Sequence, residues 1–433
     1  MAEYLSPGVY VEEVPSAVQA IAGVGTSTAA FIGVFGDSIT ALEPNPAYDP
    51  TAKPPEPRPT RTARGGAARS DETAATAPTP EPSSSRAQRY LEKRVDVTPS
   101  GEVRLCTNFT EFRKAFGDFS TDPGQSNLAH AVFGFFNNGG RRCFVARVAD
   151  RAGVKDALDK FAAIDEIAIV AVPGETDAAV RDAVLAHCDD PITGDRFAIF
   201  DSPPDVAPAD ITVPGTSKNA AFYYPWISVV DPIEKLRNPD ASGLRFVPPS
   251  GFVAGIYARV DDERGVHKAP ANEVIRGALG LAVPVTKSHQ SGLNPKGVNC
   301  IREMNGTIRV WGARTMGGDA NGEWKYINVR RLFLFLRESI DEGTQWTVFE
   351  PNDSRLWAKI TRNVTAFLTT VWRAGALFGN TPAEAFYVKC DAETNPPDER
   401  ELGRVITEIG VAIVRPAEFV IFRVSQWTGT QTR

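Results

Sequence analysis

The clearest alternation of hydrophobic and polar segments predicts a strand-helix-strand unit. Residues 167–172 form an apolar run, residues 176–187 carry a helical pattern, and residues 197–200 form a second apolar run. Parallel strands need such a crossover, and a parallel sheet is covered on both faces. The pattern therefore predicts the α/β fold class, a mixed core with a parallel βαβ unit.

Similar patterns surround this unit. Residues 29–35, 142–148, 221–230 and 307–313 predict strands, and residues 326–338 predict a helix with one apolar face. Together they predict an α/β domain built from residues 26–42 and 90–345.

The strongest helical pattern covers residues 354–374, with Asp353 as a candidate cap and Gly375 at its end. One broad face contains Leu356, Trp357, Ile360, Val364, Phe367, Leu368 and Val371. The opposite face contains Arg355, Lys359, Arg362 and Arg373, within about 60° of arc at 100° per residue. Residues 385–390, 405–414 and 418–427 then predict three β segments, so residues 346–433 predict a C-terminal α+β assembly domain.

Strand-forming segments without a local partner lie near both ends of the sequence. Residues 1–25 predict an extended arm whose β formers are Val9, Tyr10, Val11 and Val14. A second segment has the character of a strand covered on both faces, and it contains Phe419, Val420, Ile421, Phe422 and Val424. Because an unpaired edge recruits another chain, both arms are predicted to be inter-subunit strands. The alternative for the second arm is a hairpin with residues 405–414.

Residues 43–89 differ in composition from the rest of the chain. They are rich in Pro, Ala, Arg, Ser, Thr and Glu, and Tyr48 is their only large apolar side chain. Such a segment cannot bury enough surface to offset the entropy of ordering it. We expect an exposed insert on the outer surface.

Composition argues against several classes of partner. The formal net charge of -6 favours no nucleic acid contact, and the apolar runs are far below the roughly 20 residues that cross a bilayer. Residues 1–11 do not have the pattern of a secretory signal. The five cysteines are widely spaced without a CxxC pair, which favours a reducing compartment and buried thiols.

No catalytic or cofactor motif is recognised, so no catalytic, cofactor-binding or metal-binding residue is predicted. The nucleophile elbow, the phosphate-binding loop and the HExxH zinc pair are all missing from the sequence. Gly23 and Gly25 precede an apolar strand, whereas an anion site needs a following helix, so a turn is favoured there. His187 and Cys188 are adjacent on a predicted helix and point about 100° apart.

Several segments resemble a known family in order along almost the whole chain outside 43–89. They include Ser6-Pro7-Gly8-Val9-Tyr10 within 4–14, then 23–33, 248–251, 254–259, 263–266, 268–272, 312–315 and 330–331, and finally 395–397, 403–404, 408–412 and 415–422 through Gln426-Trp427. These segments are similar to those of phage tail sheath proteins.

The resemblance implies a structural protein without enzymatic activity, a subunit of a contractile injection machine. Its implied partners are further copies in a helix of stacked rings, an inner tube protein, and baseplate and terminal cap proteins, without nucleic acid contact or membrane insertion. It implies assembly in the cytoplasm of the producing bacterium, or a place in a virion tail or released particle.

The resemblance also implies that the C-terminal region faces the inner tube. We therefore expect Arg355, Lys359, Arg362 and Arg373 to contact the tube, the alternative being an ordinary solvated helix face. Without a nucleotide-binding motif, the work of contraction would come from the difference between two subunit packings. The alternative functions are a non-contractile tube, capsid or surface-layer subunit and, third, an enzyme with an unrecognised site.

Overall fold

A computed structural model describes residues 20–46, 48, 89–190, 194–238 and 240–423. The predicted arm residues Val9, Tyr10, Val11 and Val14, the arm residue Val424 and most of the predicted insert lie outside these ranges. Their roles stay predictions.

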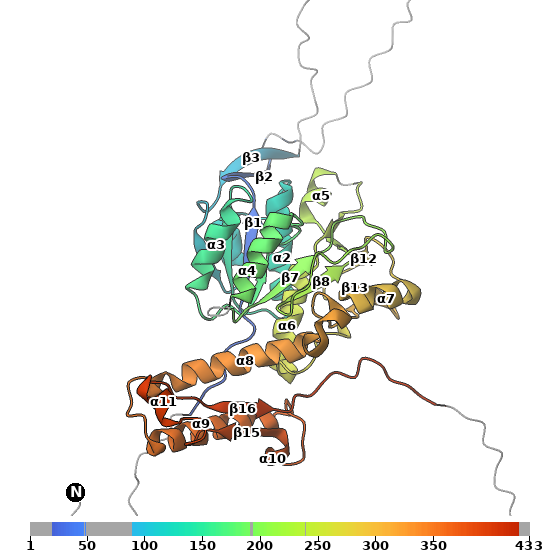
Figure 1. Ribbon diagram of the computed structural model, residues 1–433. Helices are drawn as coiled ribbons and strands as arrows, with labels where there is room; N and C mark the ends of the chain where they lie inside the picture. The colour runs from blue at the N-terminus through green and yellow to red at the C-terminus, as the bar shows by residue number, and fades with distance from the viewer. Residues whose placement is uncertain (1–19, 47, 49–88, 191–193, 239, 424–433) are drawn as a thin grey trace, which may run out of the picture.

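A nine-stranded sheet forms the centre of the described chain (Figure 1). Its order is β11 (Glu273–Val274), β14 (Thr307–Val310), β13 (Val298–Met304), β8 (Ala220–Tyr224), β7 (Phe197–Asp201), β6 (Ile169–Ala171), β1 (Ala29–Val34), β5 (Cys143–Val148) and β4 (Val103–Cys106). The strands from β13 to β5 are parallel, and the pairs at the two edges are antiparallel. This topology confirms the predicted mixed α/β fold.

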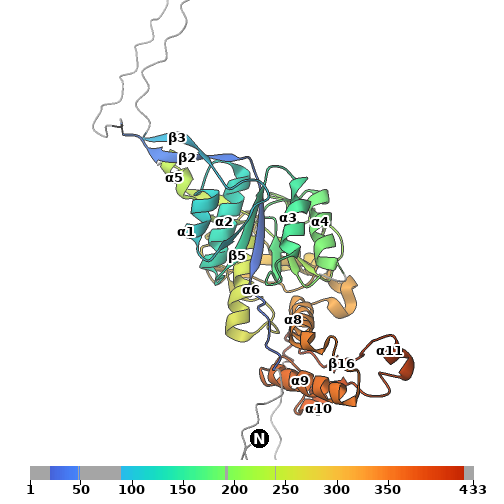
Figure 2. The same ribbon diagram turned by 90° about the vertical axis from the view of Figure 1, so that its left-hand side faces the viewer.

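Helices cover both faces of the sheet, as a buried parallel sheet requires. One side carries α1 (Phe109–Phe116), α2 (Pro123–Asn137) and α6 (Ser250–Arg264), and the other carries α3 (Gly153–Ala162) and α4 (Ala178–Asp189) (Figure 2). Side chains of a strand alternate between faces, so Phe31 packs in the first core while Ala30 and Ile32 pack in the second. The predicted βαβ unit is β6, α4 and β7.

The predicted strand at 221–230 is wrong in one respect, because it is two strands. The chain leaves the large sheet after β8 and continues as β9 (Ile227–Val230). Pro225 lies between them and has no N–H to continue the ladder. Strand β9 instead pairs with β10 (Leu244–Val247) and β12 (Gly280–Leu281) in a small antiparallel sheet.

Shorter helices complete this part of the chain. They are α5 (Pro232–Arg237), α7 (Lys287–Leu293) and the 3-10 segments Asn294–Lys296 and Gly318–Trp324.

A two-stranded ribbon, which the sequence pattern did not predict, carries the insert. Strand β2 (Ser38–Pro44) pairs antiparallel with β3 (Tyr90–Asp96), from Ser38 opposite Asp96 to Pro44 opposite Tyr90. The ribbon lies at the end of the α/β body far from α9 (Figures 1 and 2). The predicted insert therefore starts and ends at the open end of this ribbon.

The C-terminal unit consists of α8 (Ile327–Thr344), a 3-10 turn at Gln345–Thr347, α9 (Ser354–Arg373), α10 (Pro382–Ala385), β15 (Phe386–Lys389), α11 (Pro397–Glu401) and β16 (Glu408–Val411). Helix α8 lies between the body and the unit of α9, β15 and β16 (Figures 1 and 2). Its Leu334 packs in the body's core, whereas Leu332 and Leu336 pack with the apolar face of α9. One helix thus couples the two cores.

The predicted helix at 354–374 is confirmed as α9. The carboxylate of Asp353 accepts hydrogen bonds from the backbone N–H groups of Arg355 and Leu356, and Gly375 follows the helix in a left-handed conformation with φ 83°.

All five cysteines are free and buried, which confirms the expectation of buried thiols. Within the described ranges, the helices are too short or too polar to cross a bilayer.

Candidate assembly interfaces

The chain approaches β1 along helix α8. Ile21 is buried against Gly343, and the backbone N–H of Val24 donates to Ser339 Oγ at 3.1 Å. The last described residues of the predicted N-terminal arm are therefore held on the C-terminal unit before they enter the central sheet.

A buried ion pair, the N-terminal clamp, holds this segment where it meets the sheet. Arg331 of α8 donates to both carboxylate oxygens of Asp261 at 2.9 and 2.6 Å and to the carbonyl of Thr26 at 2.8 Å. Thr26 Oγ1 donates to the same carboxylate at 2.6 Å. The side chains of Arg331 and Asp261 are 4% and 5% exposed, so water competes little for these bonds.

Electrostatics keep this arginine charged. Burial alone would lower the pKa of Arg331, but the ion pair and hydrogen bonds with Asp261 raise it above its ordinary value. The guanidinium also lies over the ring of Tyr257, 4.7 Å from its centroid.

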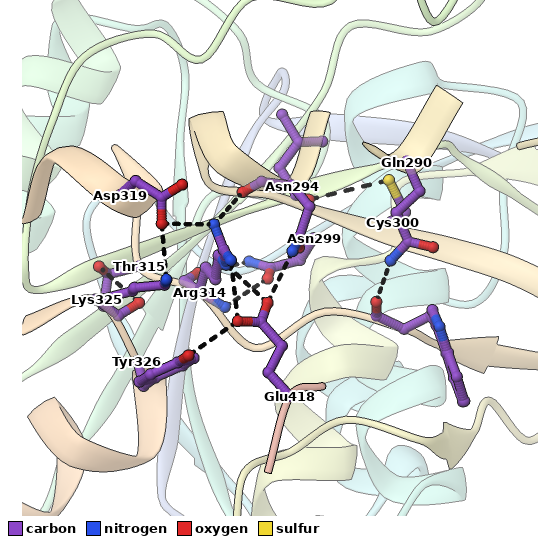
Figure 3. Close-up of polar contacts among 12 residues, drawn as sticks. Gln290, Asn294, Asn299, Cys300, Arg314, Thr315, Asp319, Lys325, Tyr326 and Glu418 are labelled. Carbon is purple, nitrogen blue, oxygen red and sulfur yellow. Dashed lines mark hydrogen bonds and ion pairs between the residues drawn. The ribbon is translucent and has the colours of Figure 1, made fainter. Parts of the chain in front are cut away.

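A second buried arginine, Arg314, forms the C-terminal clamp together with Asn294, Tyr326 and Glu418 (Figure 3). Glu418 Oε1 accepts from Arg314 Nε at 2.8 Å and from Asn294 Nδ2 at 2.7 Å. Glu418 Oε2 accepts from Arg314 Nη2 and from the Tyr326 hydroxyl, both at 2.9 Å. Arg314 is 3% exposed at its side chain and also donates to Asp319 at 3.0 Å. The clamp pins the start of the C-terminal arm to the body.

The clamp stabilises the charged form of Glu418. Burial alone would raise the pKa of Glu418, but the hydrogen bonds from Arg314, Asn294 and Tyr326 outweigh it and lower the pKa below its ordinary value. Burial, followed by the hydrogen bond to Glu418, raises the pKa of Tyr326 to about 12. At neutral pH the phenol therefore donates to a carboxylate.

Beyond the clamp, the described residues of the C-terminal arm are exposed to solvent. Phe419, Val420, Ile421 and Phe422 are 69%, 68%, 78% and 86% exposed. The strand predicted at 418–427 is not formed in its described part, residues 418–423, because a strand needs a neighbouring edge. The hairpin alternative is wrong for these residues, because residues 418–423 do not pair with β16.

Strands β15 and β16 form a two-stranded antiparallel sheet, called here the acceptor sheet. Phe386 lies opposite Val411 and Lys389 opposite Glu408, which confirms shortened forms of the strands predicted at 385–390 and 405–414. One face packs on α9 through Phe386, Val388, Ile409 and Val411. No further strand of the described chain pairs with either outer edge. An isolated two-stranded sheet is marginal in water, so open edges of this kind recruit strands.

The basic stripe of α9 is also unpaired in this chain. Arg355, Lys359, Arg362 and Arg373 are all exposed. In the part of the chain that the structure describes, no carboxylate lies within ion-pair distance of any of them. Their contact with an inner tube stays a prediction.

Comparison with known proteins decides the family. Residues 149–316 match the phage tail sheath protein central domain, and residues 319–426 match the phage tail sheath C-terminal domain. This chain belongs to the phage tail sheath family. The family's C-terminal domain includes α8 and both residues of the Tyr326–Glu418 contact.

Curated tail sheath relatives share about a quarter of aligned positions. A putative prophage major tail sheath protein of Pseudomonas aeruginosa (strain UCBPP-PA14) is 27% identical over 208 residues, which cover 46% of this chain and 52% of that protein. The tail sheath protein of Vibrio phage KVP40 is 28% identical over 192 residues, covering 43% and 27%. The matches thus span about half or less of the length of these relatives.

Three solved structures align over nearly the whole chain. The anti-feeding prophage helical sheath in the contracted state gives a TM-score of 0.68 at 28% identity, covering 98% of this chain and 99% of that chain. A chain from the anti-feeding prophage baseplate gives 0.67 at 28% identity, with 98% and 100% covered. The sheath complex of an extracellular contractile injection system in the contracted state gives 0.68 at 24% identity, with 99% of each chain covered, and supports the fold.

Arg314, Arg331 and Glu418 lie within segments that resemble the family, but the sequence did not indicate that they form these ion pairs. Arg314 and Glu418 are 104 positions apart, and Arg331 and Asp261 are 70 apart. The sequence did indicate that these positions matter, because each buried arginine, like Glu418, lies in a segment that resembles the family.

Proposed function

We propose that this chain is the sheath subunit of a contractile injection machine. Copies polymerise into a helical sheath of stacked rings around an inner tube, and contraction drives that tube through a target envelope. The observation that carries the proposal is the bare apolar arm after Glu418, in a sheath-family chain whose acceptor sheet has two open edges. The contracted state of the structurally similar anti-feeding prophage sheath supports it.

The arms and the acceptor sheet suggest how copies are linked. Each chain would supply two strands, from the segments 9–14 and 419–424 that the sequence predicts as donors, and it has one sheet with two edges. Two neighbours would each donate one strand by β-augmentation and complete a four-stranded sheet on α9. The side chains of Phe419 to Phe422 would then leave water.

The clamps give these links a mechanical role. Each arm starts from a buried Arg–carboxylate pair on the rigid body, so the donated strand stays attached while bodies rotate past each other. The free energy for contraction would be the difference between two lattice packings. When many copies move together, a few kcal/mol each is sufficient.

The basic stripe is proposed to hold the inner tube. Exposed ion pairs are each worth about 0.2–1 kcal/mol and are screened by salt, so such a grip can be released when the sheath fires. Baseplate and terminal cap proteins are proposed as further partners at the ends of the polymer.

Truncation tests the donated arm. Removing residues 1–15 should leave a folded monomer that forms no sheaths, because the donor strand 9–14 is lost. The matched control removes 15 residues of the insert, 60–74, and should assemble normally. Normal sheaths from the first truncation would contradict the role of the arm.

Microscopy separates contraction from static assembly. Negative-stain images of purified particles should show two populations, one long and narrow and one short and wide. Particles of a single length and diameter, before and after mild denaturant, would instead favour the non-contractile tube, capsid or surface-layer alternative.

A further inference from the structure

Two cysteines face each other across the edge of the central sheet. In the antiparallel pair of β4 and β5, Cys106 lies directly opposite Cys143. Opposite residues in such a pair have Cα atoms about 4.5 or 5.5 Å apart, and disulfides bridge Cα separations of about 4.4–6.8 Å. Both cysteines belong to the same core cluster, so their side chains lie on the same face of the sheet.

We propose that Cys106 and Cys143 are a modification site, a dithiol that closes to a cross-strand disulfide with a small-molecule disulfide as oxidant. This inference is independent of the assembly proposed above.

The other three cysteines do not form such a pair. Cys188 lies on α4, and Cys300 lies opposite Tyr224 in a parallel pair. Cys390 follows β15, and its sulfur accepts a hydrogen bond from Asn395 at 3.7 Å. Cys106 and Cys143 alone lie opposite each other in the strand registers of the described chain.

Access to the pair comes from the sheet edge. Strand β4 has four residues and is the outermost strand, and Cys106 is its last residue before the exposed Thr107 and Asn108. Short edge strands open locally at low cost. Cys143 lies on β5, which is covered on its other side by β1. Cys106 is therefore the attacking thiol, and Cys143 resolves the intermediate.

Burial makes the reaction slow in the closed state. Burial, and then the charge of Glu111, raise the pKa of the Cys106 thiol to about 12. Burial, and then the neighbouring Cys106, raise the pKa of Cys143 well above its ordinary value. Because the thiolate is the nucleophile, exchange proceeds through the opened edge.

The proposed chemistry is two successive exchanges. The Cys106 thiolate attacks one sulfur of a disulfide RSSR, forms a mixed disulfide and expels one thiolate RS⁻. The Cys143 thiolate then attacks the Cys106 sulfur and expels the second RS⁻. Two protein thiols are oxidised, RSSR is reduced to two RSH, and the two protein protons end on the two RSH molecules.

The disulfide would join β4 covalently to β5 at the edge of the sheet. The bond closes the segment 107–142, which contains α1 and α2, and prevents β4 from separating from β5. Because such a cross-link restricts the unfolded chain, the oxidised protein should unfold at a higher temperature than the reduced protein.

Thiol counting on the full native chain tests the proposal. The protein is incubated with excess glutathione disulfide at pH 8, and free thiols are alkylated after denaturation and counted by mass spectrometry. Of the five thiols, two should be lost, and peptide mapping should find Cys106 joined to Cys143. The oxidised chain should have the higher melting temperature.

Cysteine variants supply the controls. C143S should show no cross-link to Cys106, and C106A repeats this result from the other side of the pair. C188S removes a cysteine that is equally buried, and it should still form the bond. Retention of all five thiols after prolonged incubation, or a cross-link between another pair, would overturn the proposal.

Discussion

Replacing Glu418 with glutamine tests whether the C-terminal clamp directs the arm. The substitution keeps the shape of the side chain but removes its charge and one acceptor oxygen. Since Glu418 accepts four hydrogen bonds, the amide nitrogen must face one pair of donors, either Arg314 Nε with Asn294 or Arg314 Nη2 with Tyr326. We expect the arm to detach from the body.

The magnitude follows from the burial of Arg314. Breaking a buried ion pair by removing one partner costs about 3–5 kcal/mol, and losing one charged hydrogen bond costs about 1.5–3 kcal/mol. Arg314 keeps Asp319 and the carbonyl of Asn294, so the lower part of this range applies. A loss of about 2–3 kcal/mol reduces the ratio of docked to undocked arms roughly 30- to 150-fold.

A spin label at position 417, introduced as A417C, lies directly beside Glu418 and reports whether the clamp is closed. The native thiols are all buried, so labelling is selective. With E418Q the label should become more mobile and sheath yield should fall, while the melting temperature of the monomer barely changes because the body's cores are untouched. The matched control is E393Q, since Glu393 is 80% exposed in a surface pair with Lys389. A label equally immobile in E418Q and parent, with equal sheath yield, would refute the reasoning.

The same clamp should respond to acid. Because the pKa of Glu418 is lowered in the folded state, its contribution is complete above the unfolded value of about 4.3 and is lost as pH falls through the folded value. The label in the parent should therefore be released only in strong acid. In E418Q it should be mobile at every pH.

Three further predictions concern other parts of the chain. Burial, and then neighbouring carboxylates, raise the pKa of Glu338 to about 7, so its contribution to stability falls as pH rises from about 4 to 7. E338Q should therefore raise the free energy of unfolding at pH 8 by less than about 1 kcal/mol after solvent screening, seen as a slightly higher melting temperature, and an unchanged or lower melting temperature would count against it. Reversing three charges of the basic stripe, Arg355, Lys359 and Arg362, to glutamate should leave the fold intact but prevent assembly around inner tubes. Sheaths that still form around tubes at normal yield would show that the stripe is only solvated surface. Deleting residues 46–87 at the open end of the β2–β3 ribbon should leave assembly and contraction unchanged; failure to form particles would show that the insert is part of the lattice.

The local pattern of apolar and polar residues was sufficient to predict the central helices and strands. The apolar strand β1, the β6-α4-β7 unit and helix α9 were each predicted within a few residues, because continuous apolar runs and one-sided helical faces are local properties of the sequence. The family-like segments identified the class of protein for the same reason, since each is contiguous.

Contacts between distant residues could not be predicted this way. The pairing of Arg314 with Glu418, and of Arg331 with Asp261, depends on which segments the sheet topology brings together. The ribbon β2–β3 joins segments that are separated by the whole insert.

The state of the C-terminal arm shows the limit of the sequence most clearly. Its apolar residues by themselves indicate a strand, yet residues 419–422 form none in a single chain and are largely exposed. A helix satisfies its hydrogen bonds within one segment, as α9 does, whereas a strand takes its structure from a neighbouring edge. The sequence alone therefore determined which segments can become strands, and the tertiary structure decided which of them find an edge within the same chain.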